Sequence, residues 1–140
     1  MKLAPTADRN APGAAHVLRF LRLLLAGRLK EAAAGVTADM VFLGRRGWHG
    51  EATPFRDDAK LQEGSLRQLP PEEVAAIDPE KQRVAFEVTI GPNELVYFAI
   101  VRTPMSYATL GIIAREEEGG YLISRLFDTK RVKETLLPAN

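Results

Sequence analysis

Apolar side chains in the first quarter of the chain recur at three- and four-residue spacing, which is the period of an α-helix. The pattern predicts a helix that begins at Gly13 and ends at Gly27, because glycine accepts the left-handed backbone that often closes a helix. A second, short helix is expected over residues 28–35. Together the two helices have to bury one apolar stripe against the rest of the chain. The stripe consists of Val17, Phe20, Leu21, Leu24 and Leu25.

The middle of the chain predicts short elements that proline and glycine separate. Residues 40–43, MVFL, predict a strand that closes in the glycine-flanked turn of residues 44–47. A third helix is predicted within residues 51–66, with Pro54 in its first turn, where a missing N–H is tolerated. Residues 74–77 predict a small strand.

The second half of the chain predicts four successive strands. Apolar and polar positions alternate over residues 84–90, which indicates a strand with one buried face. Further strands are expected over residues 94–102, 107–114 and 121–128, and the first two of these are apolar on both faces. Helices first and strands afterwards predict an α+β domain, in which one curved antiparallel β-sheet wraps around the N-terminal helices.

The two-sided apolar strand at residues 94–102 has one face that lies away from the N-terminal helices and needs a cover. A second copy of the sheet would supply that cover by forming a homodimer through the outer sheet face. The alternative is that the C-terminal tail covers this face within the same chain, through Val132 and Leu136. The two-sided apolar pattern of this strand favours the homodimer.

The domain organisation is expected to be simple. Residues 13–130 predict a single domain, because no linker and no internal repeat interrupt them. Residues 1–12 combine two prolines with small and polar residues and predict a flexible N-terminal arm. Residues 131–140 form a charged C-terminal tail.

The composition is that of an ordinary globular domain, with 46% hydrophobic and 26% charged residues and a net charge of +1. Basic and acidic residues are interspersed, which argues against nucleic acid as a partner. There is no cysteine, so disulfides, thiol catalysis and thiolate metal sites are excluded. Residues 17–27 are apolar, but they are too short to cross a bilayer. We therefore expect a cytoplasmic protein with no membrane partner.

No motif of a known catalytic or cofactor site stands out. The chain has no glycine-rich stretch with phosphate-loop spacing, and no motif supports a serine–histidine–aspartate arrangement. The two histidines, His16 and His49, are far apart and have no carboxylate at metal-ligand spacing. We therefore expect no metal and no cofactor.

Four segments carry a resemblance to a known family: Phe20 to Gly27 with Leu29, Ala38 to Phe42, Trp48 to Glu51, and Gly120 to Asp128. In these segments the chain resembles the nuclear-transport-factor-2-like superfamily, which includes the SnoaL-like cyclases and has a cystatin-like cone. The resemblance covers about residues 13–130 and implies a cone-shaped barrel of the order α-α-β-α-β-β-β-β. It also implies a ligand pocket between the helices and the concave face of the sheet.

The catalytic residues of this superfamily do not carry over. Its isomerase-like members place a tyrosine on the first helix, a carboxylate base near the end of the first strand, and a second acid on the penultimate strand. The matching positions in this chain are Phe20, Gly44 and Thr109, so all three polar groups are missing. Because proton abstraction of the isomerase type needs a base and an oxyanion donor, the resemblance does not imply that mechanism.

His49 is a candidate polar group of the implied pocket. It follows Trp48 in a loop that resembles a pocket rim, and an imidazole suits general acid–base work. The alternative is a solvated loop histidine with no role. His16, at the start of the first helix, is expected at the surface.

Arg125 is the second candidate. Strand alternation places it on one face with Tyr121, Ile123 and Phe127, where the guanidinium would point into the pocket and bind a carboxylate or phosphate. The alternative is a bulge that shifts the register, so that Arg125 reaches solvent or pairs with Glu87.

Other polar and aromatic residues are predicted to have structural roles. Asp39 is expected in a loop connection or a backbone hydrogen bond, and Tyr97 in the core. Glu51 suits the start of a helix. Residues 116–118, three glutamates, and residues 45–46, two arginines, are expected to form solvated turns.

The sequence thus predicts a small protein with a hydrophobic pocket that binds a small apolar or weakly acidic molecule. A first alternative is a SnoaL-like isomerase, cyclase or hydrolase that uses His49 as acid–base and Arg125 as electrostatic stabiliser. A second alternative is a dimerisation or scaffold module whose cone is filled by its own side chains. The candidates for ligand binding are Phe20, Phe42, Trp48, His49, Tyr107, Arg125 and Phe127.

Overall fold

Two helices open the fold. The structure, a computed structural model, describes residues 11–136. Helix α1 (Pro12–Leu25) has proline in its first turn, and α2 (Leu29–Ala33) follows after Gly27, whose φ of 78° suits glycine. The predicted helix pair is confirmed, with bounds that shift by a few residues. Of the predicted arm over residues 1–12, all but the last two positions lie outside the described residues.

The strands form one curved, unclosed sheet of mixed direction. Within the described residues the sheet has 7 strands in the order β2-β1-β7-β6-β5-β3, and β4 pairs with β5 as well. The predicted all-antiparallel sheet is wrong, because β1 and β7 run parallel. The strands are β1 (Val36–Phe42), β2 (Arg45–Arg46), β3 (Lys60–Leu61), β4 (Arg67–Leu69), β5 (Glu94–Arg102), β6 (Tyr107–Glu117) and β7 (Gly120–Asp128).

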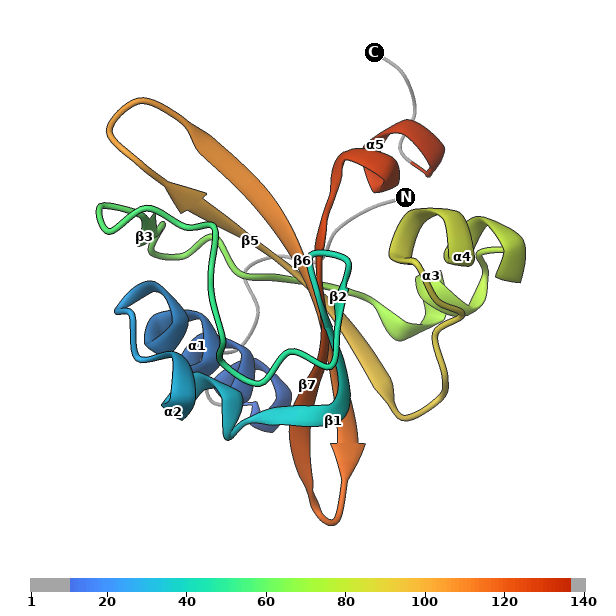
Figure 1. Cartoon of the computed structure of the whole chain (residues 1–140). Helices are drawn as coiled ribbons and strands as arrows, with labels where there is room; N and C mark the ends of the chain where they lie inside the picture. The colour runs from blue at the N-terminus through green and yellow to red at the C-terminus, as the bar shows by residue number, and fades with distance from the viewer. Residues whose placement is uncertain (1–10, 137–140) are drawn as a thin grey trace.

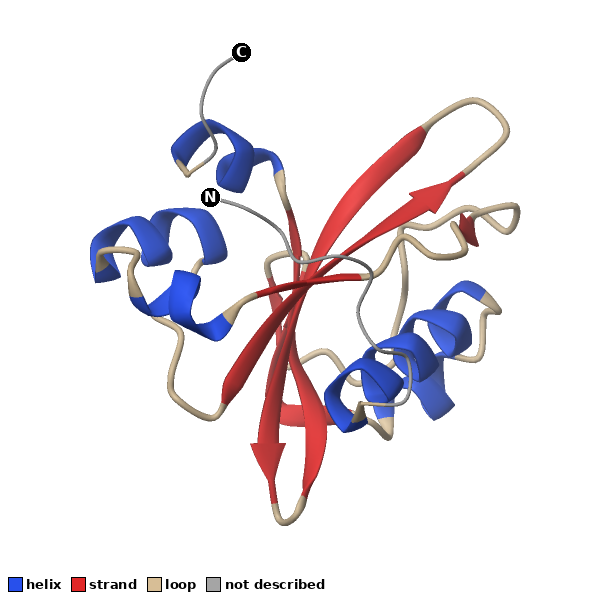
Figure 2. Cartoon of the chain, turned by 180° about the vertical axis from the view of Figure 1, so that it is seen from behind, coloured by secondary structure: helices blue, strands red, loops and turns tan. Residues whose placement is uncertain are grey.

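Helices cover both faces of this sheet. Helices α1 and α2 lie on one side, whereas α3 (Pro71–Ala75), α4 (Pro79–Phe86) and α5 (Lys130–Thr135) lie on the other (Figures 1 and 2). We call the face toward α1 the inner face and the face toward α3, α4 and α5 the outer face. Along β5 the predicted alternation is confirmed, because Tyr97 and Ala99 pack in the inner core while Val96 and Phe98 pack in the outer core.

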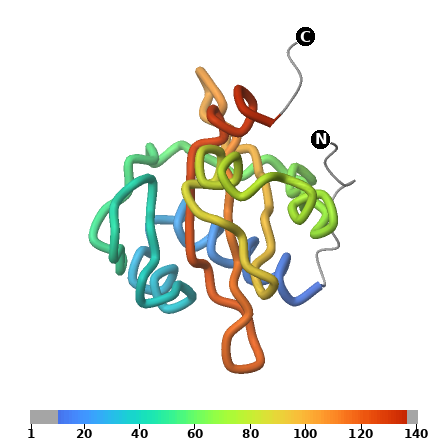
Figure 3. The backbone as a smooth tube through the Cα atoms, turned by 90° about the vertical axis from the view of Figure 1, so that its right-hand side faces the viewer, coloured from blue at the N-terminus to red at the C-terminus, as the bar shows by residue number. Residues whose placement is uncertain are grey.

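The outer face is covered from within the chain. Val74 of α3, Phe86 of α4 and Val132 of α5 are buried against it, and Leu136 packs at its margin. Figure 3 shows these three helices in front of the central strands. Cover by the C-terminal tail is therefore confirmed, with α3 and α4 as additional cover. The apolar surface from which the homodimer was predicted is already buried.

The predicted strand over residues 84–90 is wrong, since residues 79–86 form α4 instead. Asp78 caps this helix, because its Oδ1 accepts the backbone N–H of Glu80 at 2.8 Å, and Pro79 occupies the first helical position. Phe86 is buried by the outer core, whereas Val84 is exposed. The alternation of apolar residues was therefore coincidental, and the cap signal before it was decisive.

The predicted helix over residues 51–66 and the predicted strand over residues 74–77 are also wrong. The first segment runs without a helix, and Leu61 pairs with Val101 as part of the short edge strand β3. Its apolar residues still reach the inner core from this irregular path. The first two residues of the second segment belong to α3, which begins at Pro71 and ends at Ala75.

A buried glutamine connects α3, α4 and the segment that follows them. The side-chain amide of Gln82 donates to the carbonyl oxygens of Val74 at 3.0 Å and Ile77 at 2.7 Å. Its Oε1 accepts the backbone N–H of Ile90 at 2.8 Å. Because buried polar groups are costly without partners, these three bonds hold the chain on either side of Glu87 in place.

The outer core depends on one glycine in the middle of β6. Gly111 pairs with Phe127 of β7, and the ring of Phe127 occupies the space above it. That ring also meets the rings of Phe86 and Phe98 edge-on, at centroid distances of 5.9 and 6.4 Å. A side chain at residue 111 would compete with the aromatic cluster for the same volume.

We predict that Gly111→Ala destabilises the protein by about 3 kcal/mol or more, because overpacked core positions cost energy of this order. The added Cβ would overlap the Phe127 ring. Urea unfolding measures the effect. The control is Gly35→Ala, whose Cβ would meet only the Ala32 carbonyl oxygen at 3.6 Å. Equal stabilities of the two variants would contradict this account of the outer core.

Candidate functional site

A bulge in β7 decides where Arg125 lies. Ala114 of β6 pairs with Ile123 and Ile113 pairs with Arg125, so Ser124 is an extra residue without a partner in register. The hydroxyl of Ser124 donates to the carbonyl oxygen of Ile113 at 3.3 Å. Ile123 therefore faces the inner core, whereas Arg125 and Phe127 face outward. The predicted placement of Arg125 with Tyr121 and Ile123 is wrong, and the alternative with a bulge is confirmed.

Two arginines flank one valine in a row across three strands. Val41 of β1 pairs with Arg46 of β2 on one side and with Arg125 of β7 on the other. Directly paired residues of neighbouring strands point to the same face of a sheet, here the outer face. With strands about 4.8 Å apart, the two arginines start from backbones about 10 Å apart and their long side chains can converge.

The hairpin between β1 and β2 places Arg46 in this row. Leu43 and Gly44 form its two-residue turn, and both have positive φ angles, of 48° and 85°. Such turns match the twist of paired strands, and they need a residue like glycine. The backbone N–H of Gly47 donates to the carbonyl oxygen of Met40 at 2.8 Å, which closes the pair. Residues 45–46, predicted as a solvated turn, are therefore a short strand.

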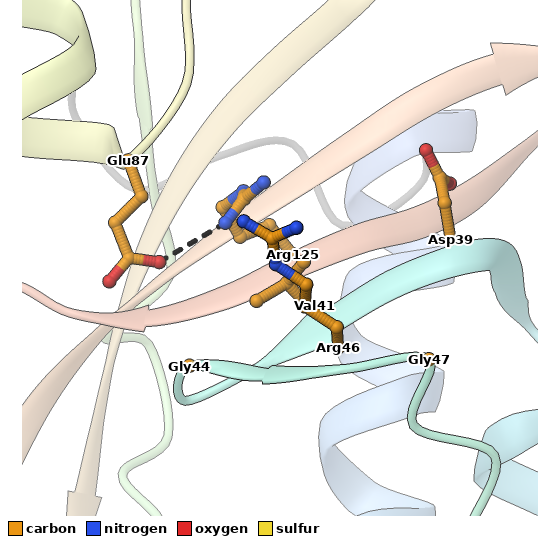
Figure 4. A pocket seen from close by; sticks show the side chains of 7 residues that line it. All are labelled: Asp39, Val41, Gly44, Arg46, Gly47, Glu87 and Arg125. Carbon is orange, nitrogen blue, oxygen red and sulfur yellow. Dashed lines mark hydrogen bonds and ion pairs between the residues drawn. The ribbon is translucent and has the colours of Figure 1, made fainter.

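A cavity of about 580 Å³ lies over this row. Figure 4 shows the guanidinium groups of Arg46 and Arg125 extending toward the side of the sheet on which the Glu87 carboxylate lies. A cavity of this size is typical of small-molecule sites. Its lining residues are Asp39, Val41, Gly44, Arg46, Gly47, Glu87 and Arg125.

Arg125 is held by one ion pair. Its Nη1 lies 3.1 Å from Oε2 of Glu87, and its side chain is 17% exposed. The other guanidinium nitrogens, Nε and Nη2, donate to no residue within positions 11–136. Glu87 follows α4 with a φ of 67°, the left-handed conformation that disfavours side chains. Because Glu87 is itself 36% exposed, the pair contributes at most about 1 kcal/mol to stability.

Asp39 at the other end of the cavity is engaged by a different cation. Its Oδ1 lies 3.2 Å from Nη1 of Arg115, whose Nε lies 3.6 Å from Oε2 of Glu94. The nearby Thr37 hydroxyl has the largest effect and lowers the pKa of the Asp39 carboxyl. Arg115 lowers this pKa further, whereas burial raises it. Thr37 Oγ1 reaches no hydrogen-bond partner in the described residues, so Arg115 is the direct contact. Arg46, by contrast, has no side-chain partner within residues 11–136.

The aromatic candidates of the inner face form a core. Phe42 stacks on Trp48 with a centroid distance of 4.5 Å, and Phe20 meets Trp48 edge-on at 6.3 Å. All three are buried, and the indole N–H of Trp48 donates to the Ala52 carbonyl oxygen at 2.8 Å. Their side chains fill the space in which the resemblance implied a ligand pocket.

The remaining candidates lie apart from one another. His49 is exposed, its Nδ1 lies 2.6 Å from the carbonyl oxygen of Gly47, and it does not line the cavity with Arg125. Tyr107 is exposed on the β5–β6 hairpin beneath the Arg102 guanidinium. Phe127 is buried in the outer core. Of the seven residues predicted to bind a ligand, only Arg125 lines the cavity.

Two residues of the cavity, Arg46 and Glu87, were not among the predicted binding residues. Arg46 was assigned to a solvated turn, although the glycines on either side of residues 45–46 indicate a tight hairpin after an apolar strand. Glu87 was considered only as an alternative partner of Arg125. No local pattern marks Glu87, because its position follows from the cap of α4.

Other kinds of site find no support in the described residues. No group of three or more histidine, aspartate and glutamate side chains within positions 11–136 is arranged to hold a metal ion. Nor does any helix in that range have the length and apolar character needed to cross a membrane.

Comparisons with known proteins add no functional assignment. No protein-family model matches the chain, and no curated protein does. Among solved structures, the chain is similar to a protein from Sphaerobacter thermophilus with 18% sequence identity and a TM-score of 0.46. The similarity covers 84% of this chain and 94% of that chain.

We predict that Tyr97 ionises far later than an ordinary phenol. Burial, and then the Tyr121 phenol, raise its pKa from 10.0 to about 12. Since the folded-state pKa is the higher one, this tyrosine stabilises the fold below pH 10 and the contribution is lost as pH rises through about 12. Spectrophotometric titration should show a late phenol component that Tyr97→Phe removes and that Tyr107→Phe retains. A late component that persists in Tyr97→Phe would refute the packed inner core.

We predict that Asp39→Asn lowers the free energy of unfolding by less than about 1 kcal/mol at neutral pH, because the carboxylate is largely exposed. The folded-state pKa of Asp39 lies below 3.8, so its contribution is present above pH 3.8 and is lost as pH falls through that lower value. Urea unfolding of both proteins along a pH series measures the difference. Asp57→Asn controls for the loss of a charge. A difference that is unchanged in acid would contradict the assignment.

Proposed function

We propose that the protein binds a small organic acid in the cavity between β1, β2 and β7, with Arg46 and Arg125 holding the carboxylate. The observation that supports this most directly is that two guanidinium groups line one cavity. Within residues 11–136 Arg125 engages only its Nη1, and Arg46 is exposed, so both have donors that a ligand can reach. A guanidinium presents donors in a planar fork that matches the two oxygens of a carboxylate.

The rest of the cavity fits a molecule with an apolar body. Val41 lies between the two arginines in the same cross-strand row and supplies an apolar floor. Gly44 and Gly47 border the row, and no heavy atom lies within 4 Å of the place where either would carry a Cβ. The volume of about 580 Å³ lies in the range of small-molecule sites.

We also propose that the fold is a nuclear-transport-factor-2-like cone and that the protein acts in the cytoplasm. The support for the cone is the helix pair ahead of β1, the position of α1 against the inner face, and the run of β5, β6 and β7 at the end. The support for a cytoplasmic setting is the complete absence of cysteine.

A second candidate is an interaction module with a filled cone. The packed cluster of Phe20, Phe42 and Trp48 favours it, because these aromatic side chains occupy the space between α1 and the sheet. The β5–β6 hairpin would offer the contact surface, since Met105 is 89% and Tyr107 63% exposed. The enzyme alternative has less support, because His49 and Arg125 do not share a cavity.

We predict that at least one small carboxylate raises the Tm of the protein while the matching neutral amide does not. At about ten times its Kd, a ligand adds about 1.4 kcal/mol, which corresponds to about 5 °C for a chain of this size. A thermal-shift screen of carboxylate–amide pairs measures this effect. Arg46→Gln and Arg125→Gln should each abolish the shift.

The control is Arg45→Gln, because Arg45 pairs with Phe42 and so faces the opposite side of the same short strand. It should retain the full shift. A screen in which no carboxylate stabilises the protein would contradict ligand binding in this cavity and favour the interaction module.

A further inference from the structure

We infer that Glu87 is an internal substitute for the ligand: its carboxylate occupies Nη1 of Arg125, and an organic acid that binds both arginines competes with it for that guanidinium and displaces it. The inference rests on the proposed function of the cavity. It adds a regulatory contact: the carboxylate of the chain itself competes with the carboxylate of the ligand.

The chemistry of the pair supports competition. The Glu87 carboxylate makes the contact with Arg125 that an external carboxylate would make, at an Nη1–Oε2 distance of 3.1 Å. Glu87 makes no contact with Arg46, the second guanidinium of the cavity. A ligand that reaches both arginines therefore replaces one contact with more than one, and it is repelled while Glu87 stays in place.

The backbone around Glu87 allows it to leave. The carboxylate is held by Arg125 alone among the described residues, and the side chain is 36% exposed. Glu87 also keeps a left-handed backbone, with a φ of 67°, directly after α4. The helix before it and the segment after it are tied together independently of Arg125, because Oε1 of Gln82 in α4 accepts the N–H of Ile90. Release of the Arg125 contact therefore leaves this tie and the packing of Phe86 in place.

The proposed competition also restricts the chemical class of the ligand. A site that a glutamate side chain already fills selects a planar carboxylate attached to a carbon chain or ring. Benzoate is a suitable probe because it has such a group on an apolar body, and benzamide is its neutral counterpart.

The test is an NMR titration of the folded protein with benzoate, using the wild type, Glu87→Gln and Glu118→Gln. Glu118 is a matched control, because it is an exposed glutamate that also has a positive φ, of 50°, but lies in the β6–β7 turn. We expect Glu87→Gln to bind benzoate about tenfold more tightly than the wild type, while Glu118→Gln is unchanged. In the wild type, benzoate should shift the Arg125 Nε–H together with the amides of Glu87 and Val88.

The possible results of the titration distinguish the anion site at Arg125 from the competition by Glu87. Equal affinities of the wild type and Glu87→Gln at Arg125 would leave the anion site standing and overturn the competition. Weaker binding by Glu87→Gln would also overturn it, since Glu87 would then position Arg125. No binding of benzoate by any of the three proteins would overturn the competition as stated for this ligand class, whereas the screen of carboxylate–amide pairs decides the site itself. If Glu87→Gln does not fold, the wild-type spectrum decides, because a shift at Arg125 without one at Glu87 and Val88 contradicts displacement.

Discussion

One extra residue in β7 sets the side of the sheet to which the end of that strand points. Ser124 has no partner in register, and its hydroxyl bonds to the carbonyl oxygen of Ile113, so the alternation of side chains is shifted from there onward. The shift brings the ring of Phe127 over Gly111 in the outer core. It also brings Arg125 out of the inner core, where an unpaired guanidinium would be costly to bury. The aromatic cluster of the outer face and the charged cavity therefore depend on the same bulge.

The outer face changes character across the sheet, and the cavity lies where the change occurs. One cross-strand row runs from Arg46 through Val41, Arg125 and Ile113 to Val96. The apolar end of the row is covered by α3, α4 and α5, whereas the end on β1 and β2 has no helix above it among the described residues. Arg125 stands at the boundary, with buried apolar neighbours on one side and an open cavity on the other. Such a position leaves part of the guanidinium accessible, with the side chain 17% exposed, beside apolar groups that lower the local dielectric.

Sequence reasoning predicted the elements whose signals are local. The strand over residues 94–102 has the predicted bounds, because an apolar run between turns has few alternatives. It failed where two signals competed: alternation at residues 84–90 indicated a strand, but the cap of Asp78 and Pro79 made a helix. The cavity was still harder to predict from the sequence, because it depends on the bulge at Ser124 and on a two-residue strand. Serine is ordinary in strands, so no local pattern marks the bulge. The glycines around residues 45–46 indicate the hairpin, but they do not show that Arg46 shares a cross-strand row with Arg125.

The inner face of the sheet is packed with apolar side chains, whereas the outer face also carries the charged residues of the cavity. On the inner face, Trp48 and its aromatic neighbours take up the space between α1 and the sheet, and the indole N–H finds its own acceptor there. A filled interior of this kind leaves no room for a solvated charge, because burying an ion without partners costs several kcal/mol. Charged groups therefore have to lie where the helical cover ends. Arg125 and Arg46 lie there, and Glu87 at the end of α4 reaches Arg125 from the covered side.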